Sequence, residues 1–250
     1  MRDRRKTMKI SLPRRKFFGL GLGALAALPV TRSLAQICGE ATAEQPLGPF
    51  FPHPGTLENP VSENDSDLTF VQGRRGMAEG QIVHIVGQVT HDCHPISGAT
   101  LIIWQAGHSG RYNHKGDAES QSFLHPQTGE LIRRTLDPSF QYWGRTVTDH
   151  NGNYRFKTIV PGFYPADLQS GWYRPPHIHF LVSATGFPQL VTQMYFDGDD
   201  LVDNPWIQEL NEQDFLLQNP NMSDEQKRKL IVIFTEQIDG LTGRFDINLT

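Results

Sequence analysis

The chain has 250 residues, of which 38% are hydrophobic, and this length suits one large globular domain or two small ones. Nine of the 23 Lys and Arg but only one of the 27 Asp and Glu lie in the first 35 residues, so the rest of the chain has a net charge near −12. Such an acidic chain excludes nucleic acid as an expected partner. The 23 glycines and 17 prolines favour a turn-rich architecture dominated by strands.

Residues 1–35 are predicted to be a signal peptide. They begin strongly basic, continue with a short apolar run and end in small residues where a signal peptidase reads the chain. The run is too short to span a bilayer, so we expect cleavage and no membrane anchor. The pair Arg14-Arg15 resembles the twin-arginine signal that exports folded proteins, and it predicts a periplasmic or secreted protein. The alternative is an ordinary secretory signal with an accidental arginine pair.

Cys38 and Cys93 are the only cysteines of the chain. An oxidising compartment would let them pair as a disulfide, and two buried free thiols are the alternative. Residues 36–70 are rich in Pro, Gly, Asn and acidic residues, so we expect an amino-terminal arm that packs on the domain that follows. That domain is predicted to comprise residues 71–250.

Strand patterns dominate this domain. Apolar or alternating runs predict strands over residues 81–90, 99–106, 153–159, 177–184, 189–196 and 244–249. In the third run Tyr154, Phe156 and Thr158 share one face, while Arg155 and Lys157 share the other, which is typical of a half-buried strand. No repeat of 20 to 50 residues is present, so the strands predict an all-β, two-sheet β-sandwich with long loops and a few short helices.

One helix is predicted near the carboxyl end. Ser223 and Gln226 have the spacing of a capping box. Apolar residues follow at helical spacing, at Leu230, Ile233, Phe234 and Ile238. The β-branched residues within this stripe act against the helix.

Two histidines, His177 and His179, lie one residue apart in a predicted strand and therefore share one face. Such a pair can chelate zinc, copper, iron or nickel, although it also occurs as two ordinary half-buried residues. No H-E-x-x-H helix or cysteine pair at zinc spacing accompanies it, so further ligands must come from elsewhere. Tyr112 and Tyr164 are the candidates, with ring packing as the alternative for each.

Four segments carry a resemblance to a known family: WQAGHSGRYNHKGD, DPSFQYWGRTVTDHNGNYRFKTIVPGFYP, WYRPPHIHF and TQMYFDGDD. Their order and spacing resemble those of the intradiol ring-cleavage dioxygenases, most closely the protocatechuate 3,4-dioxygenase type, over about residues 45–250. The resemblance implies a mononuclear, non-haem Fe(III) with Tyr112 and His177 as equatorial and Tyr164 and His179 as axial ligands. It also implies a catalytic sandwich domain that inserts both atoms of O2 into a catechol-type substrate to give a cis,cis-muconate.

The same resemblance implies roles for three side chains. Tyr164 would leave the metal and accept a substrate proton, and the fixed charge of Arg174 would favour the electron-rich carbon that O2 attacks. Gln193 would orient substrate or a ligand. A surface salt bridge is the alternative for Arg174. The resemblance places residues 48–51 at the border of the pocket and gives no role to His108, His114 and His150.

One departure from the protocatechuate branch bears on the substrate. Ala166 and Asp167 stand where that branch tends to carry a large aromatic and a basic residue, which weakens the case for a carboxylated ring. A homo-oligomer or a partner subunit is compatible with the family. Two other interpretations stay open: a non-enzymatic, transthyretin-like or carbohydrate-associated β-sandwich that binds a partner, and a zinc or copper enzyme that uses only the histidine pair.

Overall fold

β1 (Ile82–His91) is the strand around which the first sheet is built. It pairs antiparallel with β7, from Ile82 opposite Ile159 to Gln88 opposite Asn153, and parallel with β14 and β15. The sheet has six strands in the order β13-β14-β1-β15, with β2 and β7 also paired to β1. The other strands are β2 (His94–Pro95), β7 (Asn153–Ile159), β13 (Phe234–Gln237), β14 (Gly240–Arg244) and β15 (Ile247–Asn248).

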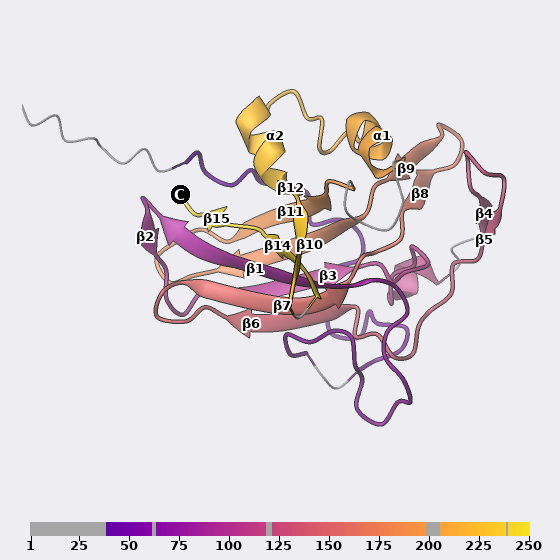
Figure 1. Cartoon of the computed structure of the whole chain (residues 1–250), viewed down its shortest axis with the longest axis horizontal. Coiled ribbons are helices and arrows are strands. Elements are labelled where there is room, and N and C mark those ends of the chain that lie inside the picture. Colours follow the sequence, from indigo (N-terminus) through magenta and orange to yellow (C-terminus); the bar gives the residue numbers. More distant parts are fainter. Residues whose placement is uncertain (1–38, 62–63, 119–121, 199–205, 239) are drawn as a thin grey trace, which may run out of the picture. The chain divides into compact units, whose positions relative to one another are not determined.

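The second sheet has five strands in the order β12-β11-β10-β3-β6. Its strands are β3 (Thr100–Gln105), β6 (Trp143–Val147), β10 (His177–Ser183), β11 (Leu190–Phe196) and β12 (Ile231–Val232). Ile178 and Phe180 of β10 belong to the main hydrophobic core, so His177 and His179 project from the other face of this sheet. The two sheets form the layers of a sandwich (Figure 1), which confirms the predicted fold class.

The core between the sheets follows the alternation seen in the sequence. Tyr154, Phe156 and Thr158 of β7 are buried, and Arg155 is exposed. Val83 and Ile85 of β1 contribute to the same core cluster, and both are fully buried. Each apolar side chain of this size stabilises the fold by about 1.5–3 kcal/mol. The predicted strands over residues 81–90, 99–106, 153–159, 177–184 and 189–196 are therefore confirmed.

The predicted helix is only partly correct. α2 (Asp224–Leu230) begins at the capping box of Ser223 and Gln226, in which both reciprocal hydrogen bonds form. It ends at Leu230, however, because the next residues leave the helix as β12, which pairs parallel with β11. Ile233 is 63% exposed and therefore lies outside any buried helical stripe. Ladder hydrogen bonds and the β preference of branched residues override the helical spacing here.

The structure also contains elements that the sequence did not predict. α1 (Trp206–Gln213) and the strand pairs β4–β5 and β8–β9 lie at one end of the sandwich (Figure 1). The short strands are β4 (Phe123–Leu124), β5 (Leu131–Ile132), β8 (Tyr164–Asp167) and β9 (Trp172–Arg174), and η1 (Lys115–Asp117) is a short 3-10 helix. The strand predicted over residues 244–249 is divided between β14 and β15, although Phe245, Ile247 and Leu249 are all buried as predicted. Within the described residues, no helix has the length and apolar character needed to cross a membrane.

The computed structural model describes residues 39–61, 64–118, 122–198, 206–238 and 240–250. The predicted signal peptide and Cys38 lie outside these residues. Cys93 is disulfide-bonded, and its pairing with Cys38 stays a prediction. The described part of the amino-terminal arm follows the sheet edges: the Thr42 amide donates to the Asn248 carbonyl at 3.0 Å, and the Gln45 amide donates to the Val191 carbonyl at 2.9 Å.

Candidate active site

The two histidines of β10 lie buried on the outer face of the second sheet. Nδ1 of His177 lies 2.7 Å from the Pro175 carbonyl, which can only accept a hydrogen bond, so Nδ1 carries the proton and Nε2 has the lone pair. That Nε2 lies 3.2 Å from the hydroxyl of Tyr112. His179 stacks on Trp104, with ring centroids 4.7 Å apart, because the two residues are opposite each other in the β3–β10 ladder. Nδ1 of His179 is buried and has no hydrogen-bond partner.

The two tyrosines reach the histidines from separate segments. Tyr164 begins β8, and its ring centroid lies 5.9 Å from that of His177. Tyr112 lies in the loop after β3, and its ring stands edge-on to that of Tyr164 at 5.7 Å. Both phenol side chains are buried, Tyr112 at 2% and Tyr164 at 7% exposure. The structure thus brings together the four side chains that the sequence suggested as ligands.

The loop that carries Tyr112 is held by charged and polar contacts on both sides. Asp117 of η1 accepts a hydrogen bond from the Tyr112 amide at 2.8 Å and pairs with Arg134 at 3.0 Å. The guanidinium of Arg134 also lies 5.4 Å from the ring centroid of Tyr164, over its face. The buried Asp117–Arg134 ion pair therefore contacts the backbone of Tyr112 through its carboxylate and the ring of Tyr164 through its guanidinium. It connects the segments that carry the two tyrosines.

The amino-terminal arm holds the same loop from the other direction. Arg111 forms an ion pair with Glu58 at 2.6 Å. The Asn113 side chain accepts from the Asn59 amide at 2.8 Å and donates to the Asn59 carbonyl at 2.7 Å. Both neighbours of Tyr112 in the chain are thereby fixed to the arm.

Arg174 lies directly beside the four-residue cluster, because Tyr164 and Arg174 are opposite each other in the β8–β9 ladder. Its Nε donates to the carboxylate of Asp214 at 2.8 Å, and this ion pair is almost completely buried. One terminal nitrogen donates to Oε1 of Gln193 at 2.7 Å and lies 3.3 Å from the hydroxyl of Tyr195. A surface salt bridge, the alternative for Arg174, is therefore wrong.

Gln193 connects this arginine to the histidine strand and to the arm. It is opposite His179 in the β10–β11 ladder. While its Oε1 accepts from Arg174, its Nε2 donates to the Pro46 carbonyl at 3.0 Å. Gly48, two residues further along the arm, adopts φ 73°, and a Cβ there would lie 3.1 Å from Cε1 of His179. The arm therefore covers the outer face of the cluster.

Two phenylalanines of the arm complete this cover. The ring of Phe50 lies 4.7 Å from that of Tyr112, and the ring of Phe51 lies 4.8 Å from that of Trp104. These contacts place a second, smaller apolar cluster outside the sandwich core. Because aromatic side chains surround the polar groups, water has little access to them from this side.

Burial dominates the electrostatics of the cluster. Burial and the nearby charge of Arg174 hold the pKa of His177 and of His179 well below the ordinary value, so both imidazoles are neutral at neutral pH. Burial raises the pKa of Tyr112 and of Tyr164, which are therefore protonated phenols in the absence of a cation. Burial alone would lower the pKa of Arg174, but the surrounding Tyr164, Tyr195 and Asp214 raise it above its ordinary value, and it stays charged.

This donor set fits a hard, oxidised transition-metal ion. Neutral imidazole nitrogens with free lone pairs bind such ions, and a cation lowers the pKa of a neighbouring phenol until it binds as phenolate. Nδ1 of His179 is a buried polar atom without a hydrogen-bond partner, which a ligand bond would satisfy, and Nε2 of His177 contacts only the Tyr112 hydroxyl, itself a proposed ligand. Among the described residues, no group of three or more His, Cys, Asp or Glu side chains is arranged so that it could hold a metal ion.

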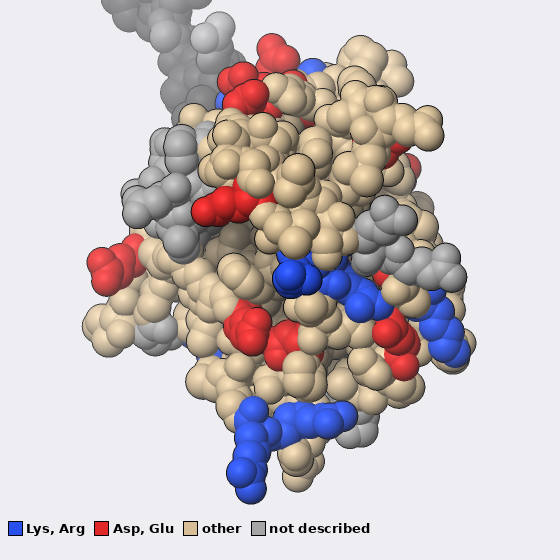
Figure 2. All heavy atoms as spheres, turned by 90° about the vertical axis from the view of Figure 1, so that its right-hand side faces the viewer, with Lys and Arg blue, Asp and Glu red and all other residues tan. Residues whose placement is uncertain are grey.

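Ala166 and Asp167, the two residues that depart from the protocatechuate pattern, lie beside the cluster in β8. A hollow of about 290 Å³ opens beside β8, lined in part by Arg134, Ala166 and Asp167. The Asp167 carboxylate is exposed and accepts from the Gln169 amide at 2.9 Å, so it faces its own loop and solvent. Figure 2 shows the face that includes β8 and β9, on which acidic and basic side chains are scattered among uncharged ones.

The three histidines to which the resemblance gives no role are not part of the four-residue cluster. His114 caps η1 by accepting the Gly116 amide at 3.0 Å, and His150 is exposed in the turn before β7. His108 lines a separate cavity. Asp214 and Asp117 are buried partners of the cluster that the sequence did not suggest. Asp117 ends η1 and Asp214 lies in the loop after α1, and no local pattern distinguishes either from an exposed aspartate.

Fold and cluster together define a β-sandwich protein with a candidate metal centre outside the sandwich core. A family model described as "Dioxygenase" matches residues 53–250. The chain is 38% identical over 140 residues to the protocatechuate 3,4-dioxygenase beta chain of Burkholderia cepacia, covering 55% of this chain and 54% of the relative. It is 30% identical over 160 residues to catechol 1,2-dioxygenase 2 of Acinetobacter lwoffii, covering 58% of this chain and 52% of the relative. The chain thus spans about half the length of these relatives.

Solved structures show the same fold. The dioxygenase domain of a dioxygenase carbohydrate-binding protein fusion from Streptomyces sp. SirexAA-E has 27% identity and a TM-score of 0.52, with 84% of this chain and 98% of that chain covered. An intradiol ring-cleavage dioxygenase from Tetranychus urticae has 23% identity and a TM-score of 0.57, with 85% and 95% covered. The chain belongs to the intradiol dioxygenase family.

Proposed function

We propose that the protein is an intradiol ring-cleavage dioxygenase that uses a mononuclear, non-haem Fe(III). Its substrate is a catechol-type ring, which is opened between the two hydroxylated carbons with incorporation of both atoms of O2 to give a cis,cis-muconate. One observation carries this proposal: two phenols and two neutral imidazoles from three separate segments meet in one buried cluster beside a buried arginine.

The residues that would hold the iron are Tyr112, Tyr164, His177 and His179. Bound there, Fe(III) would draw electron density from a catechol that is bound as its dianion and make the ring reactive toward O2. The donor types support this assignment, because phenolate oxygen is a hard anionic donor that favours iron in its oxidised state.

The chain's own residues would supply positioning and proton transfer. Tyr164 Oη would take up a substrate proton as the catechol binds. Arg174 is held by Asp214 and Gln193, so its positive charge has a fixed direction. That charge would stabilise the anionic substrate and the carbon at which O2 attacks. The arm and its phenylalanines would exclude water.

We propose a catechol without a required carboxylate as substrate. The small side chain of Ala166 leaves the hollow open where the related branch tends to carry a large aromatic residue. Arg134, the basic group in that hollow, is already paired with Asp117 and the Gly110 carbonyl, so it is a poor partner for a substrate carboxylate.

The amino-terminal segment leads to a proposal on localisation. We infer export through the twin-arginine route to the periplasm or the exterior, because this route carries folded proteins and lets iron bind before export. A homo-oligomer or a second subunit is compatible with the proposal, and one similar protein is named as a beta chain.

The decisive experiment combines metal content, colour and oxygen uptake. Tyrosinate bound to Fe(III) absorbs visible light, so protein produced with ample iron should be red and contain one iron per chain. It should consume O2 when a panel of catechols is added. A colourless protein that neither retains iron nor consumes O2 would contradict the proposal and favour a binding module. Retention of zinc or copper with catalytic turnover would instead favour the enzyme that uses only the histidine pair.

A further inference from the structure

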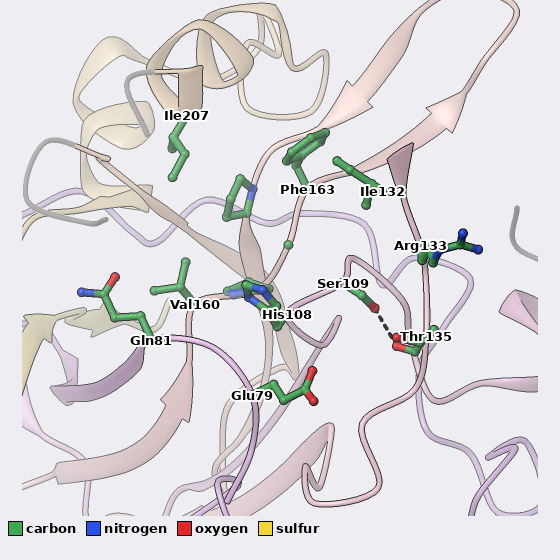
Figure 3. Close-up of a pocket in the computed structure, with 13 residues that line it drawn as sticks. Glu79, Gln81, His108, Ser109, Ile132, Arg133, Thr135, Val160, Phe163 and Ile207 are labelled. Atoms are coloured by element: carbon green, nitrogen blue, oxygen red, sulfur yellow. Dashed lines mark hydrogen bonds between the residues drawn. The ribbon is translucent and has the colours of Figure 1, made fainter. Parts of the chain in front are cut away.

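A cavity of about 450 Å³ lies next to the segments that carry the candidate site, and Figure 3 shows the residues that line it. Its lining comes from the segments 79–81, 108–109, 132–135 and 160–163, from Pro176 and from Ile207 of α1. The volume is in the range of small-molecule sites, about 300–1,000 Å³. The six predicted site residues are not part of this lining.

The wall between the cavity and the candidate site adjoins two of the four proposed ligands, Tyr164 and His177. Phe163 lines the cavity, and the next residue in the chain is Tyr164. Pro176 lines it directly before His177. Phe163 and Pro176 thus border the cavity, while the residue that follows each of them, Tyr164 or His177, belongs to the candidate site.

The loop that leads to Tyr112 is packed against the same wall. A Cβ on Gly162 would lie 2.3 Å from the His108 carbonyl oxygen, and one on Gly110 would lie 2.4 Å from the Phe163 carbonyl oxygen. The Gly162 amide also donates to the Gly107 carbonyl at 3.0 Å. Since these backbones touch, a molecule in the cavity would contact both of them.

The lining has one apolar side and one polar side. Figure 3 shows Phe163, Ile132 and Ile207 on one side of the cavity and Glu79 on the other. Val160 and two prolines add to the apolar lining. A flat ring or a short hydrocarbon body suits this surface.

The polar lining includes possible donors such as Arg133 and His108, but its one buried polar atom without a hydrogen-bond partner is an acceptor. Oε1 of Gln81 is buried and has no hydrogen-bond partner, and Glu79 adds a carboxylate. The hydroxyl of Ser109 is already committed, because it donates to the Thr135 carbonyl at 2.6 Å. A ligand that matches this lining therefore brings a hydroxyl donor on an apolar body.

We propose that this cavity is a second binding site, for a phenol, and that its occupant alters turnover in the candidate active site through the shared wall. The phenol hydroxyl donates to Gln81 or Glu79, and the ring packs against Phe163 and Val160. The part that concerns turnover rests on the proposed function, whereas the part that concerns binding does not.

The test measures binding of 4-methylphenol to the full chain by isothermal titration calorimetry, with 4-methylanisole as the matched probe that lacks the donor. We expect the phenol to bind about fivefold to tenfold more tightly than the ether. Gln81→Leu should remove most of that difference, and it should fold normally because Oε1 has no protein partner to lose. Val160→Phe should fill the cavity and abolish binding of both probes. Gln189→Leu, at an exposed glutamine bonded to Ser183, is the control that should leave binding unchanged.

The possible outcomes separate the two parts of the proposal. Phenol affinity that is unchanged in both Gln81→Leu and Val160→Phe would place the phenol elsewhere and overturn the second site, as would absence of binding at millimolar concentration. Oxygen uptake with catechol alone tests the proposed function separately. If wild type binds the phenol in the cavity but its catechol turnover does not change, the coupling is refuted.

Discussion

Asp214→Asn is the substitution whose effect follows most directly from the structure. The Asp214 side chain is fully buried, and its Oδ2 accepts from Nε of Arg174 at 2.8 Å. Its Oδ1 accepts the amides of Leu216 at 3.1 Å and Leu217 at 2.8 Å. An asparagine has nearly the same shape, but its NH2 group must face one of these donors, and the charge that balances the arginine is lost.

We expect a large loss of unfolding free energy, because the charge of Arg174 stays buried without its carboxylate partner. Removal of one partner from a buried ion pair costs about 3–5 kcal/mol, and for a chain of this size each kcal/mol lowers Tm by about 2–4 °C. Since Gln193 and Tyr195 still contact Arg174, we take the lower end, a loss of about 3 kcal/mol and a Tm lower by roughly 6–12 °C.

Urea unfolding and a thermal scan measure this effect, with Glu225→Gln as control. Glu225 pairs with Lys229 at 3.0 Å one helical turn away, and both side chains are largely exposed. Such a pair contributes about 0.5 kcal/mol or less. In iron-loaded protein, kcat with catechol should fall while iron content is retained, because Asp214 contacts only the arginine and its own loop. An Asp214→Asn protein as stable as the Glu225→Gln control would show that the buried ion pair does not stabilise the fold.

Three further predictions concern the ligands, the arm and the sandwich. Tyr112→Phe should lose iron and visible colour, measured by metal analysis and absorbance, whereas Tyr154→Phe in the sandwich core should keep both. Partial burial raises the pKa of Asp67, but hydrogen bonds from Thr69 and the charge of Lys157 lower it more, so the ionised form stabilises the fold above pH 3.8. The difference in unfolding free energy between wild type and Asp67→Asn should therefore narrow as the pH falls from 5 to below 3, and a difference that widens would contradict this sign. Gly87→Ala should cost at least about 2 kcal/mol in urea unfolding, because its Cβ would lie 1.9 Å from the Phe245 carbonyl oxygen, and an unchanged midpoint would contradict the packing argument.

Much of the fold could be predicted from the sequence, because strand alternation is a local property. The period of two in residues 153–159 predicts which side chains of β7 are buried, and the structure confirms it. The capping box of Ser223 and Gln226 was equally readable, since all its atoms lie within four residues. The end of that helix could not be predicted from the sequence, because it depends on the pairing of Ile231 with Tyr195 in a distant strand.

The same distinction holds for the candidate site. The spacing of His177 and His179 determines that they share a strand face, and the motifs around Tyr112 and Tyr164 predict the family. Sequence alone does not determine which face looks outward from the sandwich, since β10 is buried on both sides. That is decided by the packing of Ile178 and Phe180 into the core, which leaves the histidines to the arm.

Local sequence patterns predicted five strands of the sandwich, the family and six candidate site residues. Tertiary structure alone decided that Asp214 holds Arg174, that Asp117 and Arg134 support both tyrosines, and that a second cavity lies next to the segments that carry the cluster. The difference lies in the distance along the chain over which each interaction acts. Periodicity, caps and turns act over a few residues, whereas ion pairs and cavities join segments whose separation along the chain no local pattern encodes.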